Sequence, residues 1–347
     1  MKVRLGKSCL VSILLIGVGV AAWLFFSREK PLDTRFSGAY RLDDGRLVFV
    51  TPRDSESLRY RLMSGESAAL RPAGQRVFEA GRGWAETEPI EVTVTFDAID
   101  SGPPTGMSWR TMSGEQHAAR LPLPEVLDSL QSGELTLRAK LVLPEGDGPF
   151  PTVVFVHGSG ADSAVDTYFN PYMMAAHGIA GLAFDKRGTG GSEGDYNQNF
   201  HLLSDDVAAA VDWLRTRPEV DPDRIHLAGY SQGGWIAPLA ATKTEVTSLL
   251  INYGPMVPIT GEDRWGYVYA LEQAGFGDDA IREVDVVNDL ASRIVDHGED
   301  RWDELGVALA EIEDAEWFDA VRGSDSMIGF LTDSSMPMWA MKLYAWW

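Results

Sequence analysis

The sequence predicts an α/β protein: a parallel β-sheet with helices on both faces, preceded by a β-rich module and followed by a group of acidic helices. Apolar, β-branched segments alternate with helical segments from residue 135 to 254. Strands that are apolar on both sides are typical of a parallel sheet covered by helices. Short alternating segments precede them in residues 36–120, and amphipathic, acidic segments follow in residues 260–335. We therefore divide the chain into residues 1–30, 36–120, 135–259 and 260–347.

The N-terminal segment predicts export. Lys2, Arg4 and Lys7 precede residues 8–26, which carry no charge. As a helix rising about 1.5 Å per residue, this run nearly crosses the ~30 Å hydrocarbon core of a bilayer. It continues beyond a possible signal-peptide cut near residues 20–22, so an uncleaved transmembrane anchor is favoured over a signal peptide and over a buried helix. We expect a membrane-anchored extracytoplasmic domain, or secretion to the periplasm or exterior.

Charge and cysteine content exclude several classes of function. The formal net charge of −21 argues against nucleic acid as a partner, because phosphate binding needs basic surface. Residues 248–347 hold 20 of the acids against 6 bases, which indicates a solvated helical surface. Cys9 is the single cysteine, so neither an intrachain disulfide nor a cysteine-histidine zinc pattern is possible. We expect neither a metal nor a cofactor.

The β-rich module shows strand patterns at residues 46–50, 58–63 and 90–96, with turns at residues 44–45 and 64–65. No catalytic motif occurs there, and His117 is expected at the surface. Residues 121–134 are expected to form a helical or irregular connector.

From residue 135 the expected elements alternate regularly. Strands are expected at residues 135–144, 151–156, 179–185, 224–230 and 247–254. Helices are expected between them, at residues 168–178, 202–218 and 232–243. Residues 260–335 then change to several acidic amphipathic helices with Trp and Met.

The stretch "GYSQGG" (229–234) fits a nucleophile elbow, a tight turn between a strand and a helix that exposes a serine. Ser231 is the candidate nucleophile. Gly229 and Gly233 are expected to give the helix and strand room to cross. An ordinary turn with a helix-capping serine is the alternative.

The stretch "HGSG" (157–160) follows an apolar strand and predicts an oxyanion hole, since backbone N–H groups stabilise the charge that develops in acyl transfer. One N–H is expected from Gln232 and the other from Gly158 or Ser159, with Ser159 preferred. We interpret His157 as a structural, hydrogen-bonding residue and Gly158 as a support of the loop.

These motifs resemble the α/β-hydrolase superfamily, in its bacterial esterase and serine-aminopeptidase-like branch. The resemblance rests on "HGSG", on "DKRGTGGS" (185–192) and on "GYSQGG" in that order, and covers about a third of the chain. It implies that Asp185 and Arg187 pair and brace their loop, and that the helices after residue 260 form a cap over the site.

The resemblance also implies a catalytic acid and then a histidine after the serine, each following a further strand. His297 is the only histidine after Ser231, in an acidic helix end, and is expected to be exposed. Glu262 and Asp263 are candidates for a displaced acid. We expect the acid and base to be missing, as in a fragment, a frameshifted reading frame or a degenerate homologue.

The sequence thus predicts a serine hydrolase that acts on a small-molecule ester or acyl substrate through an acyl-enzyme on Ser231. A peptidase or thioesterase of the same fold is one alternative. An inactive hydrolase-like binding protein is the other.

Overall fold

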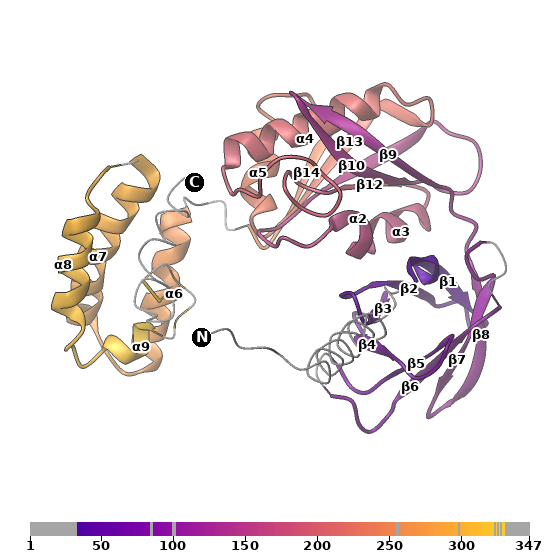
Figure 1. Cartoon of the computed structure of the whole chain (residues 1–347), viewed down its shortest axis with the longest axis horizontal. Helices are drawn as coiled ribbons and strands as arrows, with labels where there is room; N and C mark the ends of the chain where they lie inside the picture. Colours follow the sequence, from indigo (N-terminus) through magenta and orange to yellow (C-terminus); the bar gives the residue numbers. More distant parts are fainter. Residues whose placement is uncertain are drawn as a thin grey trace, which may run out of the picture. The chain divides into compact units, whose positions relative to one another are not determined.

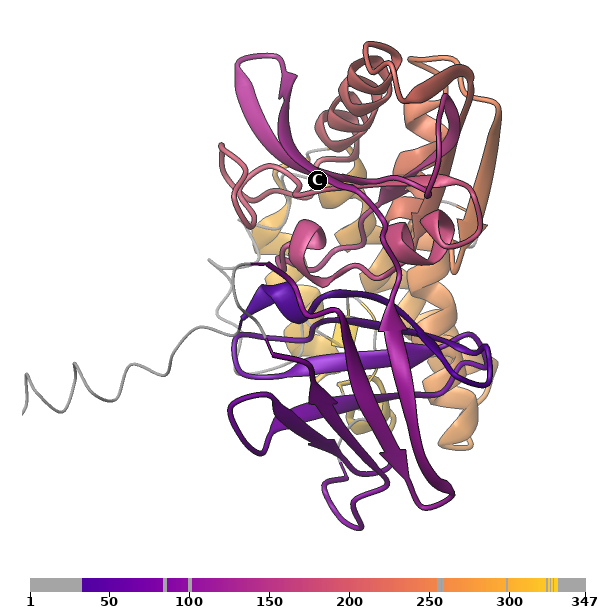
Figure 2. The same ribbon diagram turned by 90° about the vertical axis from the view of Figure 1, so that its right-hand side faces the viewer.

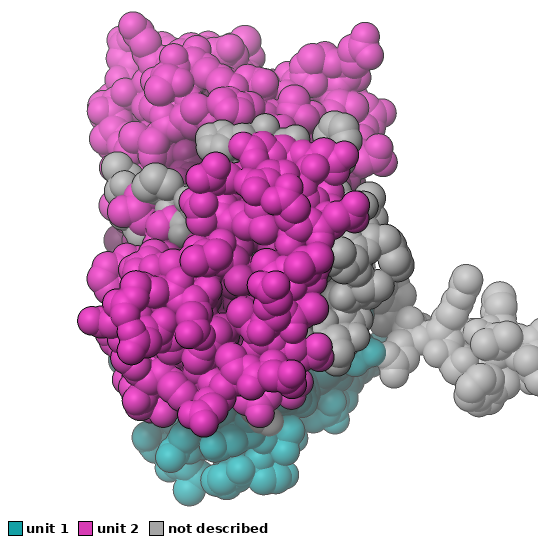
Figure 3. Space-filling model, turned by 90° about the vertical axis from the view of Figure 1, so that its left-hand side faces the viewer, with its two compact units in different colours: residues 1–123, 166–173 teal, residues 124–165, 174–347 magenta. Residues whose placement is uncertain are grey.

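The computed structural model describes residues 33–83, 86–98, 102–254, 257, 259–297, 299–322, 324, 326 and 328–329. The expected N-terminal anchor or signal peptide lies outside them. The chain divides into two compact units (Figures 1 and 3). One contains residues 1–123 and 166–173, and the other contains residues 124–165 and 174–347.

The first unit is a closed antiparallel β-barrel, which Figure 2 shows in indigo and purple. Its strands are β1 (Gly38–Leu42), β2 (Leu47–Pro52), β3 (Leu58–Leu62), β4 (Ser67–Pro72), β5 (Val77–Ala80), β6 (Val92–Phe96), β7 (Gly106–Thr111) and β8 (Gly114–Arg120). The short helix η1 (Thr34–Phe36) precedes β1. Pairing of β1 with β8 closes the barrel, with Tyr40 opposite Arg120. The expected β-rich module is confirmed, and closure removes the free strand edges that an open sheet would expose.

Alternate residues of the barrel strands point inward and form an apolar core, as the period of two in a strand requires. Phe36 stacks on Phe96 with ring centroids 4.4 Å apart, and Phe78 meets both rings edge-on. His117 lies on β8 with its side chain about half exposed, as expected.

Residues 166–173 belong to the barrel unit although the chain reaches them from the other unit. The Thr51 hydroxyl donates a hydrogen bond to the Thr167 carbonyl at 2.9 Å. The guanidinium of Arg61 lies over the Phe169 ring, 4.4 Å from its centroid. The Phe49 ring also lies 5.9 Å from the Phe169 ring, so a hydrogen bond, a cation–π contact and an aromatic contact join this short segment to the barrel.

The second unit contains a six-stranded sheet in the order β14-β13-β11-β12-β10-β9 (Figure 1). Its strands are β9 (Glu125–Ser132), β10 (Leu135–Val142), β11 (Phe150–Val156), β12 (Ala180–Phe184), β13 (Val220–Tyr230) and β14 (Ser248–Asn252). Strands β11 to β14 are parallel, whereas β10 is antiparallel to both β12 and β9. The sheet is mixed, so the expectation of a parallel sheet is correct for four of the five expected strands and wrong for β10.

The expected connector over residues 121–134 was also wrong, because residues 125–132 form β9. This edge strand pairs with β10 across a hairpin with Gly133 at a φ of +60°. Most of its side chains are exposed, and polar residues such as Asp128 and Gln131 hide the alternation that marks a half-buried strand.

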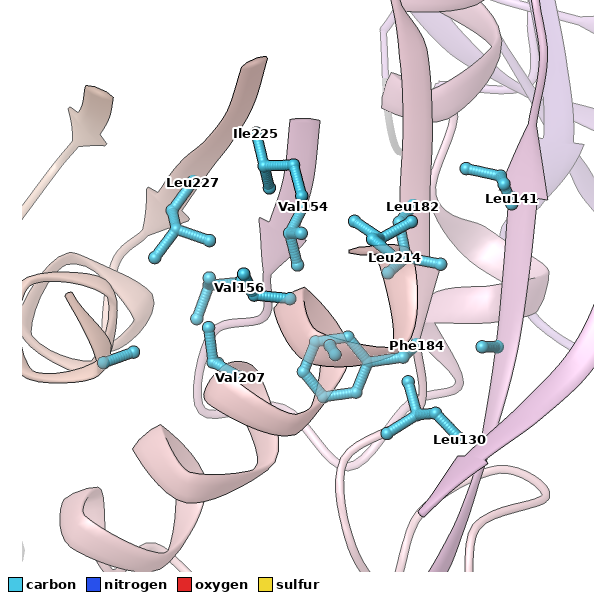
Figure 4. Packing of buried hydrophobic residues seen from close by; sticks show 14 of the residues in the cluster. Leu130, Leu141, Val154, Val156, Leu182, Phe184, Val207, Leu214, Ile225 and Leu227 are labelled. Carbon is cyan, nitrogen blue, oxygen red and sulfur yellow. The ribbon is translucent and has the colours of Figure 1, made fainter. Parts of the chain in front are cut away.

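Helices α2 (Ala164–Thr167) and α3 (Asn170–Ala175) follow β11, and α4 (Phe200–Arg215) and α5 (Gly233–Ala240) flank β13 in the chain. The core between sheet and helices is apolar: Phe184 from β12, Val207 from α4 and Val156 from β11 pack together (Figure 4). Asn199 caps α4 by accepting a hydrogen bond from the Leu202 N–H at 3.1 Å.

Helices α6 (Ile259–Gln273), α7 (Asp278–His297), α8 (Trp302–Ile312) and α9 (Phe318–Arg322) confirm the expected helical region after residue 254. They have an apolar core of their own, to which Tyr267, Val284, Leu305 and Trp317 contribute. Over the described part of the chain, no helix is both long and apolar enough to cross a bilayer.

Candidate active site

Ser231 lies at the turn between β13 and α5, where the sequence places the nucleophile elbow. Its φ of +52° falls in the left-handed region, which a non-glycine residue adopts only at a cost of about 1–2 kcal/mol. Two backbone hydrogen bonds hold this conformation: the Ser231 N–H donates to Asn252 O at 3.0 Å, and the Gly234 N–H donates to Ser231 O at 2.7 Å. The residue is exposed, so the strained turn presents the serine hydroxyl to solvent and substrate.

The elbow glycines are needed because backbone passes close to both. A Cβ at Gly229 would collide with the carbonyl of Gly233. A Cβ at Gly233 would lie 2.5 Å from Val156 O and 3.0 Å from His157 O. The crossing of strand and helix therefore leaves no room for a side chain, as the sequence indicated.

The "HGSG" loop lies beside the elbow. A Cβ at Gly158 would lie 3.6 Å from Tyr230 O and 3.8 Å from the Cβ of Ser231. In the described residues, no acceptor takes the backbone N–H of Gln232 or of Ser159. The structure thus brings the end of β11 next to Ser231, and the two expected oxyanion-hole donors form no hydrogen bond to the described residues.

A chain of side-chain hydrogen bonds joins the two sides of this site. The buried Gln232 side chain donates to Gln198 Oε1 at 2.6 Å, and Gln198 Nε2 donates to Ser159 O at 3.0 Å and also contacts the Tyr196 hydroxyl. The Tyr196 hydroxyl donates to the same carbonyl at 2.5 Å. Lys186 Nζ also donates to Ser159 O, at 3.0 Å, and to Gly158 O at 3.2 Å. The sequence reasoning missed Lys186, Tyr196 and Gln198.

His157 is buried, with its ring 5.4 Å from that of Phe184 in an edge-on arrangement. Burial, together with the nearby Lys186 ammonium, lowers the pKa of His157 to about 3. Its Nδ1 lies 3.4 Å from Gly158 O. A neutral imidazole with so low a pKa is a poor general base, which agrees with the structural role expected for it.

The loop of residues 185–192 is braced, but not by the expected pair. Asp185 is fully buried and accepts from Ser163 Oγ at 2.8 Å, from the N–H groups of Val165 and Gly191 at 3.0 Å, and from Arg138 at 3.5 Å. Arg187 instead forms a bidentate pair with the buried Asp206 of α4, at 2.6 and 2.8 Å. The prediction that Asp185 pairs with Arg187 was wrong, because each is closer to a charge on a neighbouring element.

No histidine whose side chain the structure describes contacts the Ser231 hydroxyl, and that hydroxyl has no hydrogen-bond partner among the described residues. His226 lies on β13 five residues before the elbow and contacts Ser248 Oγ at 2.8 Å. His177 and His201 are exposed at helix ends, and His297 is the last residue of α7. The candidate acids Glu262 and Asp263 lie on α6.

Among all the residues that the structure describes, no group of three His, Cys, Asp or Glu residues is arranged to hold a metal ion.

Comparisons with known proteins agree with this geometry. Residues 133–319 match the family described as X-Pro dipeptidyl-peptidase (S15 family). The chain is 34% identical over 128 residues to a thiohydrolase, AneE, of Aspergillus aculeatus, a match that covers 36% of this chain and 40% of that protein. It is 28% identical over 165 residues to the esterase EstD of Thermotoga maritima, covering 43% and 39%. The chain thus spans about two fifths of the length of each relative.

Among solved structures, the α/β hydrolase GrgF from Penicillium matches with 26% identity and a TM-score of 0.33, over 38% of this chain and 45% of that one. The family match begins just after β9 and contains β10 to β14, the elbow, the "HGSG" loop and the helices α2 to α8. It extends over more than half of the 347 residues. The chain belongs to the X-Pro dipeptidyl-peptidase (S15) family of hydrolases, with the α/β-hydrolase fold.

Proposed function

We propose that the chain is a serine hydrolase that acts on carboxylic esters through an acyl-enzyme on Ser231. The observation that carries this proposal is the position of Gly158 beside Ser231, with the N–H groups of Ser159 and Gln232 unpaired. A strained serine between two such donors is the arrangement that acyl transfer requires.

In the proposed reaction, Ser231 Oγ attacks the ester carbonyl carbon and its proton passes to a base. The N–H groups of Gln232 and Ser159 then stabilise the oxyanion of the tetrahedral intermediate. Collapse of this intermediate expels the alkoxide, which takes a proton from solvent. Water then attacks the acyl-enzyme carbonyl, and collapse of the resulting intermediate releases the acid while Ser231 Oγ regains a proton from solvent. Because no histidine whose side chain the structure describes contacts Ser231, we propose that solvent or buffer takes the proton and that turnover is slow.

Peptide and thioester substrates are the alternatives within this fold. The family description favours a peptidase, and the similarity to a thiohydrolase favours a thioesterase. The alternative that is not an enzyme is an inactive hydrolase-like protein that binds a ligand or partner through its barrel and helices.

A substrate panel tests the proposal. Hydrolysis of p-nitrophenyl butyrate, a butyryl thioester and an aminoacyl p-nitroanilide is compared for the wild type and for Ser231→Ala. Ester cleavage that depends on Ser231 and exceeds amide cleavage is expected. Faster cleavage of the anilide would support the peptidase, faster cleavage of the thioester would support the thioesterase, and equal rates in the wild type and Ser231→Ala would support the binding protein.

We also propose that residues 8–26 anchor the protein in a membrane and that the remainder is extracytoplasmic. The support is the uncharged run after three basic residues. Cell fractionation followed by protease treatment of intact cells tests this. Full-length protein in the soluble cytoplasmic fraction would contradict it.

A further inference from the structure

Lys186 combines features that its place in the 185–192 loop does not require. It is 1% exposed, and within the described residues no carboxylate pairs with its ammonium. A buried charge is costly unless it is paired or well hydrogen-bonded. The partners it has are two carbonyls of the oxyanion loop, and its Nζ lies 4.6 Å from the centroid of the Tyr196 ring.

The two carbonyls matter because each belongs to the same peptide unit as the N–H group of the next residue, and the orientation of one fixes that of the other. The carbonyl of Gly158 shares a planar peptide with the N–H of Ser159, and in a trans peptide the two point in opposite directions. The same relation joins the carbonyl of Ser159 to the N–H of Gly160. A donor that holds both carbonyls on one side therefore fixes both N–H groups toward the other side.

Ser159 O is held more firmly than an ordinary loop carbonyl. It accepts from Lys186, Tyr196 and Gln198, at 3.0, 2.5 and 3.0 Å. Gln198 in turn accepts from the side chain of Gln232, whose backbone N–H is the other expected oxyanion donor. One network thus connects both donors, with a single positive charge, Lys186, at its buried end.

We propose that Lys186 is a positioning residue for acyl transfer: it fixes the two peptides between residues 158 and 160 so that the Ser159 N–H faces the developing oxyanion. Its ammonium also adds positive potential beside the site, where such charge is stabilising only once the oxyanion forms. This inference rests on the proposed function, since it assigns Lys186 to the same site as Ser231.

The first test measures the loop directly and needs no activity. Backbone ¹⁵N order parameters of Ser159 and Gly160 are compared in the wild type, Lys186→Met and Lys243→Met. Lys243 is the control, because its ammonium also donates to a backbone carbonyl (His201 O, 2.9 Å), but it is exposed, pairs with Asp205 and lies beyond the C-terminal end of α5. We expect values near 0.85 in the wild type and control, and below about 0.6 in Lys186→Met. Equal values in all three would overturn the proposal.

The second test separates positioning from general structural damage. The rate of Ser231 phosphonylation by a fluorophosphonate is measured against reagent concentration. Lys186→Met is expected to lower the rate at saturation by about tenfold, less than the 10²–10³ typical for loss of an oxyanion donor itself. The half-saturating concentration and the melting temperature should stay close to those of Lys243→Met. A change in half-saturation alone would overturn the positioning role.

The two proposals fail in different ways. If the wild type shows no Ser231 adduct, the proposed function fails, while the order parameters still decide whether Lys186 fixes the loop. If Ser231 reacts but the loop is equally rigid without Lys186, only the present inference fails.

Discussion

The backbone of Gly233 passes so close to Gly229 that a Cβ on Gly229 would collide with the Gly233 carbonyl. This contact sets the angle at which α5 leaves β13, and with it the direction in which Ser231 is presented. The elbow depends on the absence of side chains at two positions as much as on the serine itself.

Gly229→Ala is therefore expected to destabilise the fold by about 3 kcal/mol or more, because the colliding atom is backbone and cannot move aside as a side chain would. Gly160→Ala is the matched control, since the nearest atom to a Cβ there is Asp162 Oδ2 at 3.8 Å. Urea unfolding of both variants measures the difference. Similar midpoints for the two alanine variants would show that the elbow can relax.

The contribution of Lys186 should depend on pH. Burial lowers the pKa of Lys186 to about 8. The titratable groups beside it are Tyr196 and His157, whose imidazole is already neutral in this range. The ammonium is present below pH 8 and lost above it, so the ratio of phosphonylation rates, wild type over Lys186→Met, should fall as pH rises through 8. A ratio that stays constant from pH 6 to 10 would show that the charge of Lys186 does not contribute to the rate.

The strand β14 should cause self-association. It pairs only with β13 among the described strands, and Leu249 and Leu250 are 39% and 59% exposed. An exposed apolar edge pairs readily with other strands. We expect the chain to form oligomers or aggregates in sedimentation velocity experiments, and Leu250→Lys to reduce them.

The opposite edge of the sheet supplies the control for this experiment. Leu127 on β9 is 63% exposed but stands among polar residues, so Leu127→Lys should change association little. A wild-type chain that sediments as a single monomer with a cooperative thermal transition would contradict the prediction.

The acidic C-terminal region should disfavour anionic substrates. Residues 248–347 carry 20 acids and 6 bases, and a negative field lowers the encounter rate of an anion. We expect higher kcat/KM for a neutral p-nitrophenyl ester than for a carboxylate-bearing ester of similar size, with the difference shrinking as salt rises. Equal values at low and high salt would show that the field does not reach the site.

The sequence predicted the elbow, the position of the "HGSG" loop at the end of a strand and four parallel strands because each has a local signature: glycines where backbone crosses, or apolar residues on both sides of a strand. It did not predict β9, because an exposed edge strand keeps polar residues where a connector would also have them. The partners of Asp185 and Arg187 were missed for another reason. Arg138 and Asp206 come from other elements, and only the folded sheet brings them near.

Lys186, Tyr196 and Gln198 were missed for the same reason: folding alone brings them to the "HGSG" loop. Their hydrogen bonds to Ser159 O join residues 27 to 39 positions apart, and such spacing leaves no pattern in the sequence. Lys186 stands within the quoted "DKRGTGGS" stretch, where the resemblance drew attention to its two neighbours instead.

The central claim is that Ser231 is the nucleophile, and covalent labelling tests it most directly. The 347-residue chain is incubated with a fluorophosphonate and analysed by intact and peptide mass spectrometry. We predict one adduct, on the peptide that contains Ser231, forming slowly and absent in Ser231→Ala. Rapid labelling at Ser231 would instead reveal a base that the described contacts do not include, and His297→Ala would be the first variant to examine. No adduct on Ser231 after prolonged incubation, or the same adduct in Ser231→Ala, would contradict the claim.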